Sequence, residues 1–368
     1  CNDTPDANVP TIDNNKIVVV TREGPTTYYE TMYGHSGFEY DVAQHYADAQ
    51  GKELEMIAVD SLKEVFDALE SGRAHIAAAG LTGTAERSRR YHFSPSYQSI
   101  NQYVLYRYGS FRPRKIEDLL DRKIAIHHNS SHELTMLQLS ETHPQLKWQY
   151  TEDNSALDRL AMLKRGEVEH IVLDSNDYDL HKATFPGIGI AFAIKRDDPV
   201  VWMMGAKQSN HLLASIDTFF ERIQNDGTLE ALKERHYGHI SHMRRNDSRT
   251  FANKLDDVFP DVESLIKRVA LEEGIDWRLL AAISYQESHW NPRAKSPTGV
   301  RGLMMLTQIT AREMGVTKRT DAEQSLRGGA RYYHKLYARL PEEIREPDRT
   351  WMAMAAYNVG FGHLMDAR

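Results

Sequence analysis

A glutamate near the end of the sequence lies where a helix would carry an apolar residue. Leu280, Ile283 and Glu287 recur at i, i+3 and i+7, which places them on one helical stripe. Desolvation on an apolar stripe favours the neutral form of a carboxyl group and raises its pKa. An acid that stays protonated near neutral pH can donate a proton to a leaving oxygen. The position predicts a general acid at Glu287, with a solvated helix-end glutamate as the alternative.

The segment after this glutamate contains no second carboxylate. Most glycosidases flank the scissile bond with two carboxyl groups, yet from Ser288 to Arg312 the sequence has neither Asp nor Glu. No second carboxylate is therefore available in the loop and helix right after Glu287, which favours a lyase over a hydrolase. A distant carboxylate brought close by folding is the alternative.

Three motifs follow one another at characteristic spacing. They are Glu287-Ser288, a loop with Ser296 and a Gly-Leu-Met-Met block at 302–305, and Ala-Tyr-Asn at 356–358. Their order resembles the soluble-lytic-transglycosylase branch of the lysozyme-like superfamily over roughly residues 259–368, although Met305 stands where most members have Gln. The resemblance implies an all-α lysozyme-like domain that cleaves the MurNAc–GlcNAc bond of peptidoglycan without water, leaving 1,6-anhydro-muropeptides.

The same resemblance implies a role for individual residues. Glu287 is the acid and base, and the substrate-binding residues are Ser288, Ser296, Met304, Met305, Tyr357 and Asn358. Alternatives exist: Ser296 would shape a turn, Tyr357 would be a core aromatic, and Asn358 would cap a helix end. Met304 and Met305 suit a core or a groove lining better than chemistry.

From Lys16 onward, short β-rich runs alternate with amphipathic helical stretches, which predicts a mostly parallel sheet covered by helices. The predicted strands are 17–21, 54–59, 75–79, 103–108, 124–127, 171–174 and 201–206, and the predicted helices are 38–50, 62–71, 132–141, 156–165 and 210–224.

Several motifs in this part resemble the type-2 periplasmic solute-binding family. They are a Gly-Phe-x-x-Asp helix start at 37–41, an Ala-Gly-Leu-Thr loop at 79–82 followed by Arg87, a Ser pair after Asn129, and Asp174 at a strand end. The resemblance covers roughly residues 16–240 and implies an α/β two-lobed domain that binds an amino acid or a muropeptide stem.

The chemistry of these positions suits such a ligand. Arg87 can hold an α-carboxylate through paired hydrogen bonds, and Ser130 and Ser131 can add hydroxyl and N–H groups from a helix N-terminus. Asp174 can hold an ammonium at a strand carboxyl end, and Thr82 adds a polar contact. The alternatives are a solvated basic cluster around Arg87 and a helix N-cap at Asp174. His127, His128 and His132 fit no zinc spacing, so neither a metal nor another cofactor is expected.

Composition and charge limit the remaining possibilities. The chain of 368 residues is long enough for two or three domains, and its net charge of −7 argues against nucleic acid as a partner. Cys1 is the only cysteine, which excludes an internal disulfide framework. With the polar stretch behind it, Cys1 predicts a lipoprotein attached to a membrane through lipid on this residue. A chain boundary that happens to fall at Cys is the alternative.

The expected organisation is a tether at 1–15, a binding domain at 16–240, a connector at 241–258 and a catalytic domain at 259–368 that stops short of the family's usual last helices. We expect a periplasmic enzyme, anchored to the outer membrane of a Gram-negative bacterium and regulated allosterically by its binding domain. A cell-wall sensor with an inactive lysozyme-like domain and a hydrolytic lysozyme or chitinase are the alternatives.

Overall fold

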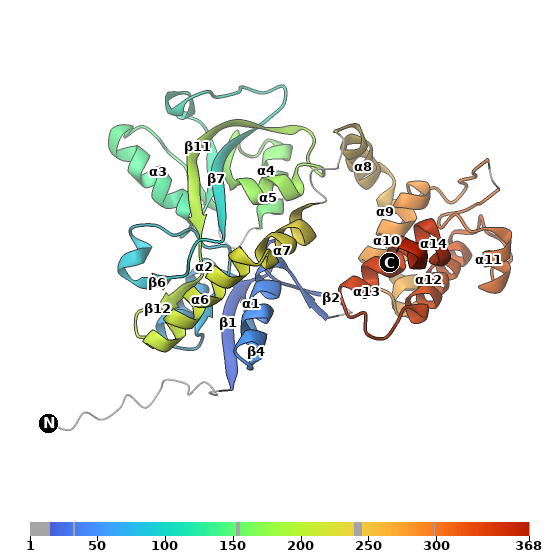
Figure 1. The fold of residues 1–368 in the computed structure, drawn as a ribbon. Helices are drawn as coiled ribbons and strands as arrows, with labels where there is room; N and C mark the ends of the chain where they lie inside the picture. Colours follow the sequence, from blue (N-terminus) through green and yellow to red (C-terminus); the bar gives the residue numbers. More distant parts are fainter. Residues whose placement is uncertain (1–14, 32–33, 152–154, 239–244, 298, 368) are drawn as a thin grey trace. The chain divides into compact units, whose positions relative to one another are not determined.

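The computed structural model describes residues 15–31, 34–151, 155–238, 245–297 and 299–367. Cys1 and nearly all of the predicted tether lie outside these ranges. The chain divides into two compact units, the first holding most residues up to Ser248 and the second those from Arg249 onward (Figure 1).

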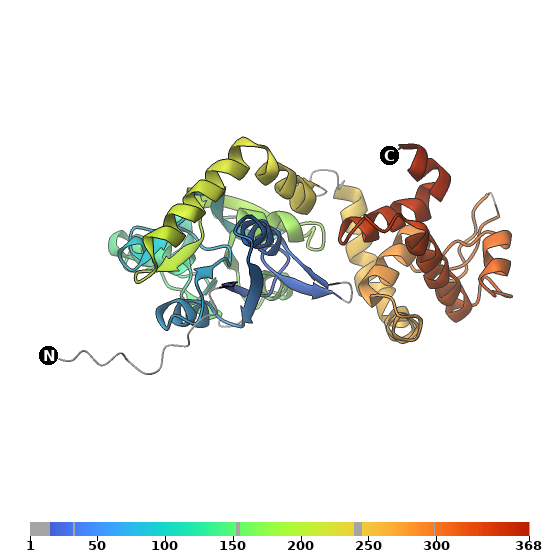
Figure 2. The ribbon, with the colours of Figure 1, turned by 60° about the horizontal axis from the view of Figure 1, so that its bottom comes forward.

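The first unit is an α/β structure of two lobes, each built on a five-stranded sheet. In the first lobe, β1 alternates between two cores: Ile17 and Val19 pack with α1, α6 and α7, whereas Val18 and Val20 pack with α2. Figure 2 shows α6 and α7 in yellow, on the side of the lobe that also carries α1. The strand order is β4(Glu53–Val59), β1(Lys16–Arg22), β5(Ile76–Ala77), β12(Met203–Gly205) and β6(Tyr91–Phe93), and the helices are α1(Phe38–Ala49), α2(Leu62–Glu70), α6(Asn210–Asn225) and α7(Thr228–Tyr237).

The second lobe follows the same plan. Leu105, Ile171 and Leu173 pack with α4 and α5 on one face of the sheet, and Val104 and Val172 pack with α3 on the other. The strand order is β11(Ile188–Val200), β7(Gln98–Arg107), β10(His170–Asp174), β8(Ile124–His127) and β9(Gln149–Thr151), and the helices are α3(Ser131–Thr142), α4(Ala156–Arg165) and α5(Ser175–His181). The short elements are η1(Arg87–Arg89) and η2(Ile116–Leu119) in this unit, and β2(Tyr29–Thr31) and β3(Gly34–Ser36), which are divided between the two units.

The sheets are mixed rather than mostly parallel, which corrects the prediction. β7 pairs antiparallel with both β10 and β11, and β12 pairs antiparallel with β5 and β6. The cause is the chain's passage between the lobes: it crosses after β6 and returns after β11. The two crossing segments lie side by side, with Tyr97 N donating to Val200 O at 3.2 Å and Ser94 N to Trp202 O at 3.0 Å.

From Arg249 onward, the second unit is helical among its described residues, apart from isolated β-bridges between residues 295 and 306. Ile266 of α9, Leu280 of α10 and Tyr333 of α12 are fully buried in one core. The predicted connector is largely the helix α8, whose Phe251 and Leu255 pack against that core. The helices are α8(Arg245–Asp257), α9(Phe259–Glu273), α10(Trp277–Ser288), α11(Gln308–Glu313), α12(Ala322–Arg339), α13(Asp348–Val359) and α14(Phe361–Ala367).

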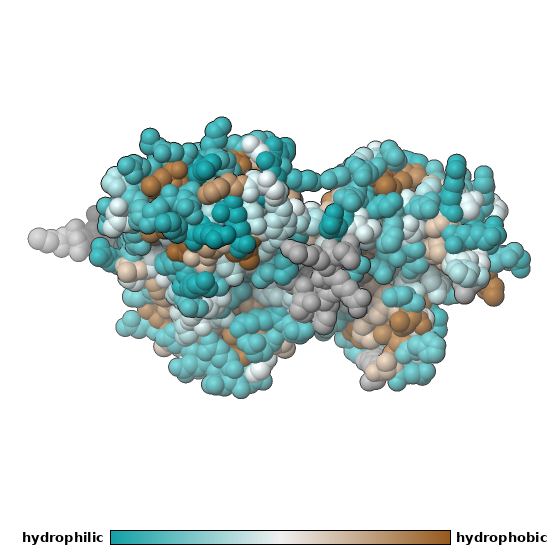
Figure 3. Space-filling model, turned by 90° about the horizontal axis from the view of Figure 1, so that it is seen from above, coloured by the Kyte–Doolittle hydropathy of each residue, from teal (hydrophilic) through white to brown (hydrophobic). Residues whose placement is uncertain are grey.

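Hydrophilic residues dominate the face seen in Figure 3, and hydrophobic residues form small separate patches on it. Within the described ranges, no helix has both the length and the apolar character needed to cross a membrane.

Candidate functional sites

Glu287 lies in the last turn of α10. Asp276 caps this helix by accepting from Arg278 N at 2.8 Å, and the stripe residues Leu280 and Ile283 are buried as predicted. Glu287 continues the stripe to its edge and is half-buried, and burial raises the pKa of its carboxyl group. No charge among the described residues contributes to this shift. The shift is in the direction that a general acid requires, and it arises from burial alone.

Two hydroxyl groups connect Glu287's surroundings to the turn at 302–305. The single O–H of Ser288 is shared between two acceptors, Ser284 O at 3.0 Å and Leu303 O at 2.9 Å. Tyr357 Oη, from α13, donates to Met304 O at 3.2 Å. Burial raises the pKa of Tyr357 well above its ordinary value, with the Glu287 charge as the next cause, so Tyr357 stays a neutral donor close to the acid. The first and third sequence motifs thus meet at the second.

The other predicted substrate-binding residues differ in what they expose. Ser296 Oγ accepts from Val300 N at 3.3 Å, so this hydroxyl shapes the 296–300 turn. Met305 is half-buried, with a left-handed backbone at φ 45°, and Asn358 is exposed on α13. Met304 is 0% exposed and its side chain packs against Gly329 of α12. The thioether of Met304 therefore belongs to the core, and its backbone carbonyl, not its side chain, takes part in the site.

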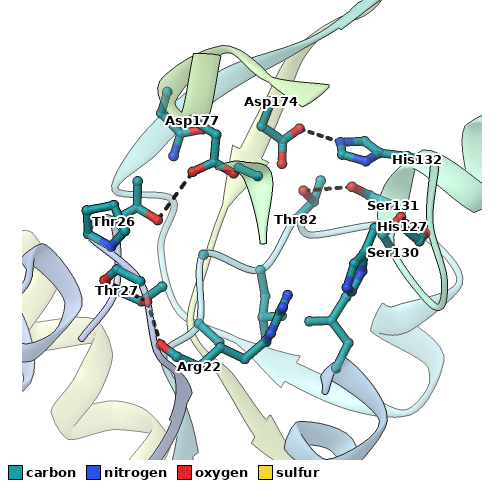
Figure 4. A pocket seen from close by; sticks show the side chains of 18 of the residues that line it. Arg22, Thr26, Thr27, Thr82, His127, Ser130, Ser131, His132, Asp174 and Asp177 are labelled. Atoms are coloured by element: carbon teal, nitrogen blue, oxygen red, sulfur yellow. Dashed lines mark hydrogen bonds and ion pairs between the residues drawn. The ribbon is translucent and has the colours of Figure 1, made fainter. Parts of the chain in front are cut away.

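The first unit holds a cavity of about 130 Å³ at the carboxyl ends of β1, β8 and β10 and beside the loop after β5. All five residues predicted from the sequence line it, which are Thr82, Arg87, Ser130, Ser131 and Asp174. Figure 4 shows Thr82, Ser131 and Asp174 directed toward the same space from different elements. This is the edge of an open α/β sheet where ligands bind.

Arg87 is 8% exposed and reaches from one lobe to the other. Its Nη1 donates to Thr82 O at 3.0 Å, its Nη2 donates to Asn129 O at 3.1 Å, and its guanidinium lies 5.1 Å from the Phe66 ring centre. Burial lowers the pKa of Arg87 to about 10, so it remains a cation at neutral pH. The predicted alternative of a solvated basic cluster does not describe this residue.

Asp174 occupies the N-cap position of α5, but its side chain makes no capping hydrogen bond. Its Oδ1 lies 2.9 Å from His132 Nε2 instead, and Nδ1 of that histidine is buried without a hydrogen-bond partner among the described residues. Ser131 Oγ accepts from Thr82 Oγ1 at 3.2 Å, whereas Ser130 Oγ donates to His127 O at 2.5 Å and caps α3. Asp174 and Ser131 therefore face the cavity, and the Ser130 hydroxyl serves the helix.

A second group of polar lining residues escaped the sequence analysis. Burial, and then the Asp174 charge, raise the pKa of Asp177 to about 6, and Asp177 Oδ1 lies 3.5 Å from Thr26 Oγ1. Burial lowers the pKa of Arg159 to about 10. Arg22 is the last residue of β1, Asp177 lies in the first turn of α5, and Arg159 lies in α4. Of these three residues, only Arg22 had a local sequence signal for a site, because it ends a strand shortly before the Gly24-Pro25 turn.

A buried carboxyl group supports the loop that carries Thr82. Glu39 is 1% exposed and accepts from Gly80 N at 3.0 Å, from Trp202 Nε1 at 2.9 Å and from Tyr97 Oη. Burial raises the pKa of Glu39. The helix-start motif of the sequence thus positions the ligand loop.

Comparison with protein families separates the chain into the same two parts. Residues 16–239 match the family described as bacterial extracellular solute-binding proteins, family 3, and residues 264–368 match the transglycosylase SLT domain. Among solved structures, an ancestral arginine-binding protein bound to arginine has 24% identity and a TM-score of 0.55, covering 61% of this chain and 98% of its own. An amino acid ABC transporter substrate-binding protein from Streptococcus pneumoniae, bound to L-arginine, has 22% identity and a TM-score of 0.54, covering 61% and 96%. Fold and sites thus define a solute-binding domain joined to an SLT domain.

Curated relatives share both domains in one chain. The membrane-bound lytic murein transglycosylase F of Saccharophagus degradans is 42% identical over 355 residues, which are 96% of this chain and 71% of the relative. The protein of the same name from Idiomarina loihiensis is 42% identical over 365 residues, 99% of this chain and 80% of the relative. The chain belongs to the membrane-bound lytic murein transglycosylase F family.

Proposed function

We propose that the second unit is a peptidoglycan lytic transglycosylase in which Glu287 is first the acid and then the base. Its carboxyl group donates a proton to the glycosidic oxygen between MurNAc and GlcNAc. The resulting carboxylate takes the proton of the muramyl 6-hydroxyl, whose oxygen closes a 1,6-anhydro ring on the anomeric carbon. The observation that carries this proposal is a half-buried Glu287 whose pKa burial raises with no second carboxylate contributing.

The neighbouring residues are proposed to hold the glycan and the acid. Tyr357 and Ser288 fix the 302–305 turn beside Glu287, while Ser296, Met305 and Asn358 contribute polar or adaptable surface to the substrate. Met304 contributes through its backbone.

Product analysis tests the reaction. Purified peptidoglycan incubated with the protein and analysed by mass spectrometry should yield muropeptides ending in 1,6-anhydro-MurNAc. Products with reducing MurNAc ends would identify a hydrolase instead. The absence of any products from a folded protein that still sediments with peptidoglycan would favour a cell-wall sensor.

For the first unit we propose a ligand with both a carboxylate and an ammonium group, either a free amino acid or a stem peptide of peptidoglycan. Arg87 supplies a cation and Asp174 an anion to one cavity, and both are held by cavity-lining partners. Arg22, Arg159 and Asp177 add charges for the rest of the ligand. Isothermal titration with the common amino acids and with a purified stem tetrapeptide tests this proposal, and no binding by any of them would exclude it.

We also propose a periplasmic protein attached to the outer membrane through lipid on Cys1, the one cysteine of the sequence. The word "membrane-bound" in the names of relatives supports membrane association. Labelling of the protein in cells with radioactive palmitate should succeed for the wild type and fail for Cys1→Ala. Equal labelling of both would exclude this attachment.

A further inference from the structure

The backbone of Met304 is held at both of its polar atoms, which belong to two successive peptide groups, by side chains from different helices. Its N–H donates to Ser325 Oγ of α12 at 3.1 Å, and its carbonyl accepts from Tyr357 Oη of α13 at 3.2 Å. A third side chain, Ser288 of α10, donates to the preceding carbonyl, that of Leu303, at 2.9 Å. One short turn is thus bound by three helices.

This turn needs such support because its backbone is unusual. Gly302 has φ +87° and Met305 has φ +45°, so both flanks of the Leu303-Met304 segment are in the left-handed region. A residue other than glycine, such as Met305, adopts this backbone conformation only where its surroundings hold it there. The hydrogen bonds from the three helices add to the turn's own backbone bonds, such as Met305 N to Gly302 O at 3.2 Å, in holding it there.

Ser325 is placed to govern this arrangement. It is 0% exposed, and a Cβ on Gly302 would lie 2.7 Å from its Oγ, so the hydroxyl has one confined position. Removal of the Ser325 hydroxyl would leave the buried Met304 N–H without this acceptor. Because a buried unsatisfied donor is costly, the backbone would rearrange to find another partner. Rearrangement of the Leu303–Met304 peptide group would also move the adjoining Met304 carbonyl, which accepts the hydrogen bond from Tyr357.

We propose that Ser325 is a positioning residue for transglycosylation: it fixes the backbone of Met304 at its N–H, and the carbonyl of the same residue orients the Tyr357 hydroxyl close to Glu287. The inference rests on the proposed function, since it assigns Ser325 a part in that reaction. Ser325 itself does not touch the glycan, because its side chain is fully buried.

Ser284 offers a matched control. It is also 0% exposed, and it lies in α10 only three residues before Glu287. Its Oγ donates within the helix, to Ala281 O at 3.0 Å, and only its backbone carbonyl, which Ser284→Ala leaves in place, meets Ser288. Ser284→Ala and Ser325→Ala therefore each remove one fully buried hydroxyl, but only Ser325→Ala removes a hydrogen bond to the 302–305 turn.

The test is a double-mutant cycle between Ser325→Ala and Tyr357→Phe in the full chain, with kcat, KM and Tm measured on purified glycan strands. Ser325→Ala should lower kcat about tenfold or more with little change in KM, as expected for a lost buried hydrogen bond that acts on the chemical step. In the Tyr357→Phe background the same change should cost at most about twofold, because its route to Glu287 is already broken. Ser284→Ala should keep kcat within about twofold at a comparable Tm.

Several outcomes would overturn the inference. Additive losses from Ser325→Ala and Tyr357→Phe, or equal losses from Ser325→Ala and Ser284→Ala, would reduce Ser325 to a packing role. If Ser325→Ala unfolds, Ser325→Cys carries the same cycle, since its thiol has the serine's shape but accepts hydrogen bonds weakly. Glu287→Gln, measured in parallel, separates the two proposals. If Glu287→Gln is inactive but the Ser325/Tyr357 cycle is additive, only the role of Ser325 is contradicted. If Glu287→Gln remains active, the proposed mechanism itself is contradicted.

Discussion

The raised pKa of Glu287 comes from its burial at the edge of an apolar helix stripe. Replacing it by Gln keeps the shape of the side chain and removes the transferable proton. The kcat of Glu287→Gln should fall by at least about a hundredfold, the ordinary contribution of a general acid, with Tm unchanged within about one degree. Release of anhydro-muropeptides at near wild-type rate by this variant would rule out Glu287 as the acid.

The pH dependence of the reaction follows from the same group. Burial raises the pKa of Glu287 above its ordinary value, so the reactive protonated form persists to a higher pH than for an exposed glutamate and is lost as the pH rises through the raised pKa. Activity should therefore fall on the alkaline side, with a midpoint above 4.5. A kcat/KM profile measures this, and an alkaline limb at or below the ordinary value would contradict desolvation as the cause.

Arg87 and Arg90 give a matched pair in the binding unit. The side chain of Arg90 is 66% exposed and pairs with Glu70 at 2.6 Å, whereas Arg87 is buried at the cavity. Arg87→Ala should weaken binding of a carboxylate ligand by about tenfold or more, the value of a charge-assisted hydrogen bond, and Arg90→Ala should leave it unchanged. Titration calorimetry compares the two. Equal affinities for Arg87→Ala and the wild type would remove Arg87 from the site.

At the scale of elements, the spacing of apolar residues predicted the helices and strands that present a regular apolar face to a core. The α10 stripe and the helix of α4 were predicted because apolar residues there recur at helical spacing, and the strand around Val19 because it is continuously apolar. β11 was missed, since its second half carries Lys195, charged neighbours and a proline. Its conformation is imposed by pairing with β7, a tertiary interaction that local pattern does not report.

The same distinction explains the sites. Strand ends and motif order located Asp174 and Glu287, because those signals are local. Asp177, Arg159 and Ser325 lie in ordinary helical sequence and acquire their roles only when another element packs beside them. The peptide role of Met304 was equally out of reach, since sequence identifies a side chain and not the bonds of its backbone.

Two glycines near the 302–305 turn allow the cost of a left-handed backbone to be measured apart from the cost of a steric clash. Gly299 and Gly302 have nearly equal φ values, +85° and +87°. A Cβ on Gly299 would meet nothing within 4 Å, but one on Gly302 would lie 1.8 Å from Arg319 O. Gly299→Ala should cost about 1 kcal/mol of unfolding free energy, from the left-handed backbone alone, and Gly302→Ala clearly more, with loss of activity. Chemical denaturation measures both, and equal costs would show that the turn has room to relax.

At the scale of the whole molecule, a two-lobed binding domain and a transglycosylase domain in one chain suggest that ligand capture changes glycan cleavage. Two crossing segments, at 94–97 and 200–202, join the lobes, and we expect them to act as a hinge whose closure a ligand can drive. The ligand biases such a change only by the difference in its affinity for the open and closed forms.

Coupling free energies of about 1–3 kcal/mol are typical, so saturating ligand should change the cleavage rate of the full chain by about five- to 150-fold. The alternative is tethering, in which the binding domain only brings the enzyme to peptide-rich wall. Cleavage of soluble glycan strands should be measured with and without ligand, because soluble substrate removes any benefit of localisation. Arg87→Ala is the control: it should show the unliganded rate at ligand concentrations that change the wild type. Identical wild-type rates in both conditions, with binding confirmed by calorimetry, would leave tethering as the account, because a ligand that binds without changing the rate has no differential affinity for the states that govern it.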